Sequence, residues 1–333
     1  MEGTGWGGVE TATMATRVCV TGAAGEVGRA LCRWLASQPE PVTVIGLDRR
    51  WTTPPDGGAH MVSVDLGEAD PERIVGEAAC DSLVHLAAIA GRAAEADPAA
   101  TDRLNVAVSG RLLSACAARR IRFVTASSVA AIGRATGGEA AGEASPLEPL
   151  SAYGRSKVAL ERLVRAAHAA GHEAVAIRLP TLLLRSQPRS GRPTSGFLSD
   201  VGRALIETGN ATTPMPPGFE LAVAGVDEAA HALGRLCLDP LPPGLPPVVN
   251  LPAFPLSAQR LAAAIAERRP HISLAVTSRP DPEVAALCGE WPRALRSAHG
   301  EWLGIRPDLS VAERIARILD RAGLPRVEAA GAA

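Results

Sequence analysis

Short apolar runs alternate with amphipathic stretches through the first half of the chain. Six of these runs are rich in β-branched residues: RVCVTG (17–22), PVTVIGLD (41–48), AHMVSVDL (59–66), DSLVHLAAI (81–89), IRFVTASS (121–128) and EAVAIRLP (173–180). Between them, apolar residues recur at helical spacing over 27–37, over 104–120 and in the stretch that begins at 151. Strands that are apolar throughout and alternate with helices predict βαβ units and a buried parallel sheet.

The pattern changes after Pro180. Segment 185–196 is polar and rich in Pro, Gly and Ser, and two further Pro-rich connections cover 212–218 and 239–247. Helices are expected around 199–208, 227–238 and 257–268. The predicted fold is a Rossmann-type doubly wound parallel sheet with a smaller mixed α/β C-terminal substrate-binding cap.

The same pattern predicts how the chain divides. We expect a flexible leader over 1–15 and a Rossmann domain over 16–184. Residues 185–322 would form mainly the cap, with part of 222–252 returning to the Rossmann domain, and 323–333 would be a flexible tail.

Composition narrows the classes of function. The 333 residues are 47% hydrophobic with a net charge of −1, so nothing indicates nucleic acid or an anionic membrane as a partner. No apolar run approaches the ~20 residues of a membrane span, and the N-terminus lacks the features of a secretory signal. The six cysteines are scattered without a CxxC pair, which favours core positions in a reducing cytoplasm over a metal site.

A glycine-rich loop follows the first predicted strand. Gly22, Gly25 and Gly28 lie between this strand and a helix, where glycines permit close approach of a dinucleotide pyrophosphate to the helix N-terminus. Asp48 ends the second strand 20 residues after Gly28, the spacing of a carboxylate that binds the adenosine ribose. This favours NAD over NADP, although the arginines at 49–50 offer a 2′-phosphate an alternative. Asp65 is a candidate for the adenine amino group.

The only tyrosine and the only lysine of the chain are Tyr153 and Lys157. Positions four apart share one face of a helix. A free phenol has a pKa near ~10, and a neighbouring ammonium favours the phenolate and so lowers that pKa toward neutrality. The phenolate could then remove a proton from a substrate hydroxyl while hydride leaves the carbon for the cofactor. Ser127 and Ser128, at the end of the fifth strand, are candidates to hold the reacting oxygen.

The motifs TGAAGEVG, HLAA, LNVAVSG, TASSVAAIG, YGRSK and IRLPT together resemble the extended short-chain dehydrogenase/reductase superfamily, also called the NAD-dependent epimerase/dehydratase family. The resemblance covers about residues 16–320. It implies Ser128, Tyr153 and Lys157 as catalytic residues, supported by Asn105 through the helix that it bends. The cofactor-binding residues that it implies are Gly22, Gly25, Glu26, Val27, Gly28, Asp48, Asp65, Leu66, Leu86, Ala87, Ala88, Asn105, Tyr153, Lys157 and Pro180. Glu26 departs from the family, which usually has an aromatic or apolar residue there.

Within that family the second half resembles the D-erythronate dehydrogenase group, through RLPTLLLR, VVNLP and the segment 279–315. This implies NAD-dependent oxidation of the C2 hydroxyl of a small sugar acid. A hydroxy acid needs a cation for its carboxylate, and Arg185 is the first candidate, with Arg189 and Arg192 as alternatives. The expected substrate-binding residues are Ser127, Ser128, Tyr153, Arg185 and Ser195. Segment 185–197 departs from the group by its length and its arginine content.

Other functions remain open from the sequence. A nucleotide-sugar 4-epimerase or dehydratase and a ketoreductase of a specialised pathway would use the same cofactor and the same three catalytic residues. A non-catalytic NAD sensor is disfavoured, because a sensor has no need of an activated phenol. A homodimer through paired helices is common in the superfamily. His85 is expected to be packed rather than catalytic, and Trp291 and Trp302 are expected to pack the cap.

Overall fold

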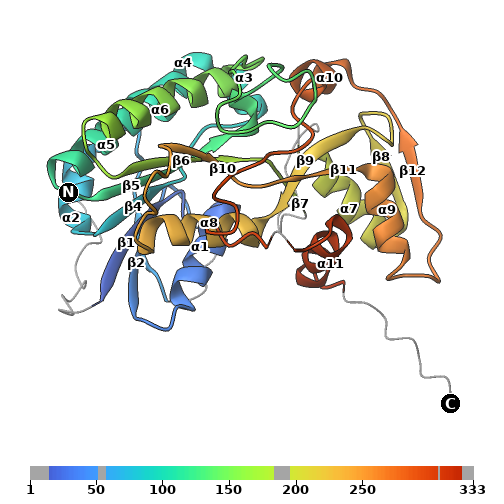
Figure 1. Cartoon of the computed structure of the whole chain (residues 1–333), viewed down its shortest axis with the longest axis horizontal. Coiled ribbons are helices and arrows are strands. Elements are labelled where there is room, and N and C mark those ends of the chain that lie inside the picture. The colour runs from blue at the N-terminus through green and yellow to red at the C-terminus, as the bar shows by residue number, and fades with distance from the viewer. Residues whose placement is uncertain (1–14, 52–57, 184–195, 307, 325–333) are drawn as a thin grey trace.

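A seven-stranded parallel sheet forms the centre of the Rossmann part of the molecule (Figure 1). The computed structural model describes residues 15–51, 58–183, 196–306 and 308–324. In sheet order the strands are β10 (Val248–Asn250), β6 (Ala174–Leu179), β5 (Arg122–Ser128), β4 (Ser82–His85), β1 (Thr16–Thr21), β2 (Val42–Asp48) and β3 (His60–Ser63). The order reverses between β1 and β4, so the sheet is doubly wound, as predicted.

Helices cover both faces of this sheet (Figure 1). One face carries α2 (Pro71–Ala78), α5 (Ser109–Ala118) and α6 (Ala152–Ala169), and the other carries α1 (Glu26–Ala36) and α8 (Val226–Leu238). The side chains of β1 point alternately to the two faces of the sheet. Val18 and Val20 pack toward α1 and α8, whereas Cys19 packs toward α2 and α5. Burial on both faces is the reason that the strands are apolar throughout instead of alternating with polar residues.

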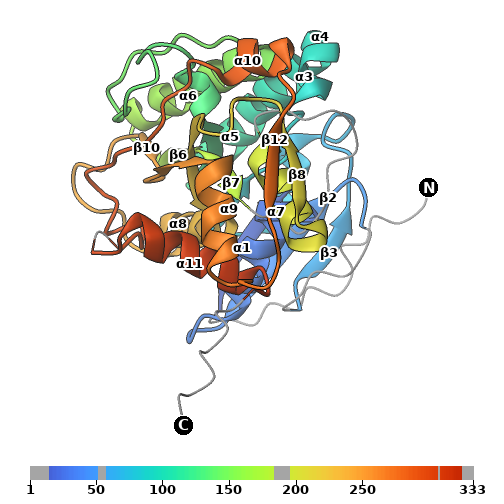
Figure 2. The same ribbon diagram turned by 90° about the vertical axis from the view of Figure 1, so that its right-hand side faces the viewer.

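The cap has small sheets and helices of its own (Figure 2). A three-stranded sheet has the order β11 (Phe254–Ser257), β9 (Glu220–Gly225) and β7 (Thr181–Leu183), and β12 (Ala275–Ser278) pairs with β8 (Asn210–Thr213). The cap helices are α7 (Phe197–Thr208), α9 (Ala258–Ala266), α10 (Pro282–Cys288) and α11 (Val311–Arg321). The mixed α/β cap agrees with the predicted fold.

The chain passes between the two parts of the fold more than once. After β9 in the cap, α8 packs against α1 and β10 extends the seven-stranded sheet beside β6. These elements lie within the segment expected to return to the Rossmann domain. The exact limits of the domains stay a prediction, and the leader and the end of the tail lie largely outside the described residues.

One helix differs from its expected form. The stretch 104–120, predicted to be helical, consists of the π-helix η1 (Arg103–Val108) followed by α5, which ends at Ala118. Two short helices, α3 (Arg92–Ala96) and α4 (Pro98–Asp102), precede it. The wider π turn contains Asn105, whose side chain is bonded to a neighbouring loop. A continuous hydrophobic period does not distinguish such a turn from an α-helix.

All six cysteines are buried free thiols, as expected of core positions. In the described part of the chain, no helix is long and apolar enough to cross a membrane. No group of three or more potential metal-ligating side chains occurs there either.

The packing of α8 on α1 yields a stability prediction. A Cβ at Gly234 would enter the indole ring of Trp34, so Gly234→Ala should destabilise the fold by about 1–3 kcal/mol through overpacking. At Gly76, also helical, the nearest heavy atom to an added Cβ is 3.7 Å away, so Gly76→Ala should be neutral or stabilising by about 0.5–1 kcal/mol. Urea unfolding followed by circular dichroism measures both. Equal midpoints for the two variants would contradict this account.

Candidate active site

The glycine loop joins β1 to α1 at the carboxyl end of the sheet. Gly22 has φ +69°, and a Cβ there would lie 2.7 Å from the backbone nitrogen of Ala87. A Cβ at Gly28 would collide with the Gly22 carbonyl, so this glycine lets α1 pack closely on the loop. Helix α1 begins directly after this loop, at Glu26, and its N-cap residue Gly25 makes no side-chain hydrogen bond to it. The loop therefore fits the pyrophosphate of a dinucleotide.

Asp48 lies at the end of β2, beside this loop. Its Oδ2 accepts a hydrogen bond from the Ala24 N–H at 3.0 Å, and its Oδ1 accepts one from the Arg50 N–H at 3.4 Å. The bond from Ala24 holds the carboxylate against the glycine loop, where an adenosine ribose is expected, and the bond from Arg50 belongs to the turn after β2. The Arg49 side chain is directed to Asp65, with 3.8 Å between Nη1 and Oδ2. These positions are compatible with NAD as the cofactor.

The other predicted cofactor residues divide into two groups. Seven line one cavity of about 260 Å³ together with the catalytic residues: Gly22, Gly25, Glu26, Val27, Gly28, Leu86 and Ala88. Pro180, which follows β6 directly, lines it as well. Ala87 follows the lining residue Leu86 but is not itself among the residues that line the cavity, and its N–H donates to Thr21 Oγ1 at 3.3 Å. Leu66 is buried in the core, and Asp65 accepts a hydrogen bond from the Gly67 N–H. The adenine contact of Asp65 and the cofactor contact of Leu66 remain predictions.

The first turn of α6 places the tyrosine. Ser151 caps this helix, because its Oγ accepts a hydrogen bond from the Gly154 N–H at 2.9 Å. A Cβ at Gly154 would collide with the Ala130 carbonyl, so only glycine lets the helix start lie this close to the loop after β5. Glu95 of α3 accepts hydrogen bonds from the N–H groups of Ala152 at 2.9 Å and Tyr153 at 3.3 Å. A carboxylate at a helix N-terminus is stabilised by the helix dipole.

Lys157 lies one turn after Tyr153, as its spacing predicts. Its Nζ is 5.5 Å from the centroid of the Tyr153 ring and donates a hydrogen bond to the Ala126 carbonyl at 2.8 Å. Burial lowers the pKa of Lys157 to about 8, and the Glu161 carboxylate opposes this shift. The ammonium therefore predominates below about pH 8 and is lost above it.

The two candidate serines have different surroundings. Ser128 Oγ accepts a hydrogen bond from the Ala130 N–H at 3.2 Å, where it caps the short helix η2 (Val129–Ala131). A hydroxyl that accepts such a bond can still donate its own proton to a substrate oxygen. Ser127 is buried, and its Oγ donates to Glu161 Oε1 at 2.6 Å. Both residues line the cavity. The bond to Glu161 favours Ser128 as the serine that holds the reacting oxygen.

Asn105 supports the site from a distance. Its amide exchanges two hydrogen bonds of 2.8 Å with the backbone of Ile89 and donates a third to Ser156 Oγ at 3.1 Å. It therefore connects the π turn, the loop after β4 and α6. This geometry agrees with the expected supporting role, and direct contact with the cofactor stays a prediction.

Several lining residues had no signal in the sequence. Glu95 and Ser151 reach the cavity from α3 and from the start of α6, and Leu287 and Trp291 reach it from the cap. Each is far from the catalytic residues in sequence or lacks a recognisable motif. The prediction that Trp291 packs the cap is confirmed, although it also lines the cavity.

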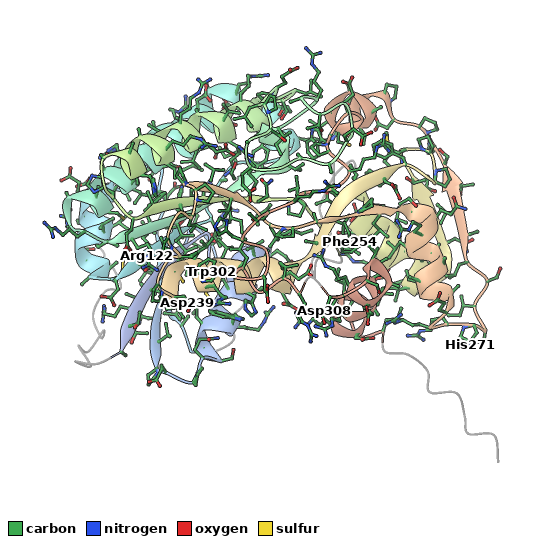
Figure 3. The ribbon with its side chains drawn as sticks, viewed as in Figure 1. Arg122, Asp239, Phe254, His271, Trp302 and Asp308 are labelled. Carbon is green, nitrogen blue, oxygen red and sulfur yellow. The ribbon has the colours of Figure 1, made fainter. Side chains whose placement is uncertain are left out.

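The structure also tests the expectations for His85 and Trp302. His85 is packed as predicted: its ring nitrogens bond to Thr21 Oγ1 at 2.7 Å and Ser109 Oγ at 2.8 Å, and burial lowers its pKa to about 3. The expectation that Trp302 packs the cap is wrong. Trp302 packs on the Rossmann core beside α8, under the Arg235 guanidinium, whereas Phe254 lies within the cap (Figure 3). The candidate substrate residues Arg185, Arg189, Arg192 and Ser195 lie outside the described residues.

The doubly wound sheet, the glycine loop and the group of Ser128, Tyr153 and Lys157 define a dinucleotide-dependent oxidoreductase of the extended short-chain dehydrogenase/reductase type. The chain belongs to the NAD dependent epimerase/dehydratase family, whose model matches residues 18–213. Its cofactor is accordingly NAD.

Known proteins resemble the chain over most of its length. D-erythronate dehydrogenase of Cupriavidus necator is 28% identical over 344 aligned positions, which cover 93% of this chain and 99% of that protein. D-erythronate dehydrogenase of Haemophilus influenzae is 24% identical, over 68% of this chain and 73% of that protein. The crystal structure of L-threonine dehydrogenase from Clostridium difficile superposes with a TM-score of 0.80 at 21% identity, over 93% and 99% of the two chains. This likeness confirms the predicted fold.

The place of Asp48 predicts how the protein discriminates between cofactors. Asp48→Asn removes a charged acceptor, so the Kd for NAD should rise about 10-fold or more, while repulsion of a 2′-phosphate is relieved. Isothermal titration with NAD and NADP measures the ratio of the two affinities. Asp81→Asn is a matched control, because Asp81 binds the Arg17 N–H near the opposite end of β1. An unchanged NAD/NADP ratio in Asp48→Asn would remove Asp48 from the ribose site.

Proposed function

We propose that this enzyme is an NAD-dependent dehydrogenase that interconverts a secondary alcohol and a ketone on a small sugar acid, such as the C2 hydroxyl of D-erythronate. The observation that carries the proposal is the likeness to D-erythronate dehydrogenase along nearly the whole chain, including the cap. The lining of the cavity supports a small substrate, since Leu287 and Trp291 of the cap line it together with the catalytic residues.

The three catalytic side chains divide the chemistry between them. The Ser128 hydroxyl donates to the reacting oxygen of the substrate and holds it near the phenol. Tyr153, as phenolate, removes the hydroxyl proton of the alcohol. NAD, when bound, supplies the acceptor for the hydride that leaves the carbon. In the reverse direction the Tyr153 phenol returns the proton to the ketone oxygen.

Lys157 provides the charge that this scheme requires. An ammonium near the phenol favours the phenolate, and the bond to the Ala126 carbonyl fixes where that ammonium lies. The family resemblance also gives Lys157 a bond to the nicotinamide ribose. One side chain would therefore serve both proton transfer and cofactor binding.

The substrate carboxylate needs a cation. Among the lining residues that the structure describes, Lys157 is the only basic side chain, whereas Glu26 and Glu95 are acidic. Glu95 is bonded to the first turn of α6, so part of its charge is compensated there. Arg185 therefore remains the proposed carboxylate partner, with Ser195 as a hydroxyl donor.

Substitution of the tyrosine tests the mechanism. Tyr153→Phe keeps the ring and removes the ionisable oxygen, so kcat for alcohol oxidation should fall by about 10²–10⁴ while NAD binding is retained. In the native enzyme the rate should rise with pH as the phenolate forms, and fall above about pH 8 where Lys157 loses its proton. Initial rates from pH 5 to 10 measure this profile. If the Tyr153→Phe enzyme oxidised the alcohol with a kcat close to that of the native enzyme, the mechanism would be refuted.

A turnover screen tests the substrate class. Four-carbon sugar acids should be oxidised with NAD, whereas nucleotide sugars and simple ketones should not be turned over. Turnover of a nucleotide sugar instead would establish the epimerase/dehydratase alternative.

Substitution of Arg185 tests the carboxylate partner. Arg185→Ala should raise KM for the sugar acid by an amount equivalent to about 2–5 kcal/mol, the cost of truncating one partner of a buried charge pair.

A further inference from the structure

A buried ion pair lies directly behind the catalytic residues. Glu161 on α6 and Arg178 on β6 have side chains that are 1% and 0% exposed. Arg178 donates from Nε and Nη2 to the two carboxylate oxygens, each at 2.8 Å. Two charges lose their hydration when they are buried, and pairing often does no more than compensate for that loss. Stability alone is therefore a weak reason for this pair.

Glu161 is placed to act on the active site. It follows Lys157 by four residues and so shares its face of α6. Ser127 Oγ donates to Glu161 at 2.6 Å, and Lys157 Nζ donates to the Ala126 carbonyl at 2.8 Å. Two adjacent residues at the end of β5 are thus bonded to α6, immediately before Ser128.

Arg178 fixes the orientation of Glu161 from the opposite side. It is paired in register with Ser127 across β5 and β6. Its Nη1 also donates to the Glu143 carbonyl at 3.2 Å and to Asn250 Oδ1 of β10 at 3.5 Å. Because the guanidinium is bonded on several sides, the carboxylate has one preferred position.

The charges around Lys157 come from several elements. On α6, Tyr153 precedes it by one turn and Glu161 follows it by one turn. His85 on β4 is neutral, since its pKa is lowered to about 3, and Arg178 on β6 is paired. Burial lowers the pKa of Lys157, and Glu161 acts in the opposite direction. Glu161 is therefore the group that favours the charged lysine.

We propose that Glu161 is a positioning residue for the catalytic lysine: fixed by Arg178 and Ser127, its carboxylate keeps the Lys157 side chain in the ammonium form and bonded to Ala126. The importance of this for turnover rests on the proposed function, in which that ammonium favours the Tyr153 phenolate. The same geometry assigns the Ser127 hydroxyl to the support of Glu161 instead of to the substrate.

The composition of the chain permits a direct test. Since Lys157 is the only lysine, protein grown with [ε-¹³C]lysine and without a lysine-containing tag gives one NMR signal whose shift follows the protonation of this side chain. The double variant Glu161→Gln/Arg178→Met removes both charges of the buried pair. The other basic partner of Glu161 is Arg165, with 4.0 Å between Nη2 and Oε2, and its side chain is 44% exposed to solvent. The midpoint of the Lys157 titration should fall by about one pH unit relative to the native protein.

Two comparisons isolate the carboxylate. Glu161→Gln alone leaves Arg178 unpaired, so where it folds its midpoint should fall at least as far. Glu228→Gln/Arg314→Met is the matched control, because Arg314 of α11 binds Glu228 of α8 through the same two-bond arrangement, at 2.9 and 3.0 Å. The Lys157 midpoint should not move in that control. An unchanged midpoint in the Glu161→Gln/Arg178→Met protein would overturn the proposal.

Activity measurements separate this proposal from the proposed function. The alkaline limb of the rate profile should shift to lower pH in Glu161→Gln/Arg178→Met, with KM for the substrate little changed. A lowered Lys157 midpoint in Glu161→Gln/Arg178→Met together with an active Tyr153→Phe enzyme would support the positioning role of Glu161 and refute the proposed catalytic mechanism.

A further variant tests the role of Ser127. Ser127→Ala should leave KM for the substrate unchanged, and a raised KM with the native Lys157 midpoint would return Ser127 to the substrate site.

Discussion

The site depends on the close contact between the end of β5 and the first turn of α6. Gly154 permits this contact, because any Cβ there would collide with the Ala130 carbonyl. Ser128 and Tyr153, which lie on different elements, are thereby brought to one cavity. Lys157 adds a bond from the same helix to Ala126. A helix that started even slightly farther away would separate the hydroxyl, the phenol and the ammonium.

The sheet supplies the rigid frame for that contact. Seven parallel strands, covered by helices on both faces, end at one edge, so the glycine loop, the loop after β4 and the end of β5 lie side by side. The Asn105 amide and the Glu161–Arg178 pair then fix particular loops and strands at this edge. These buried polar groups are fully bonded within the site, as expected of groups that specify one arrangement.

The cap completes the cavity through segments distant in sequence. The Arg293 N–H donates to the Gly138 carbonyl, and Ala253 and Leu295 exchange two backbone hydrogen bonds. These bonds hold the stretch beside Trp291 against the loop after β5 and the end of β10. A cap bonded in this way can shape the outer part of the site while the catalytic edge stays unchanged.

The sequence alone determined the features that depend on local spacing. Apolar strands alternating with helices predicted the parallel sheet, and three glycines between a strand and a helix predicted the cofactor loop. Tyr153 and Lys157 could be paired because four residues make about one helical turn. Only the tertiary structure revealed that Glu95 binds the start of α6 and that Glu161 meets Arg178 and Ser127. It also placed Trp302 beside α8 instead of in the cap. Those contacts join residues far apart in the chain, and no local period encodes which distant side chains will meet.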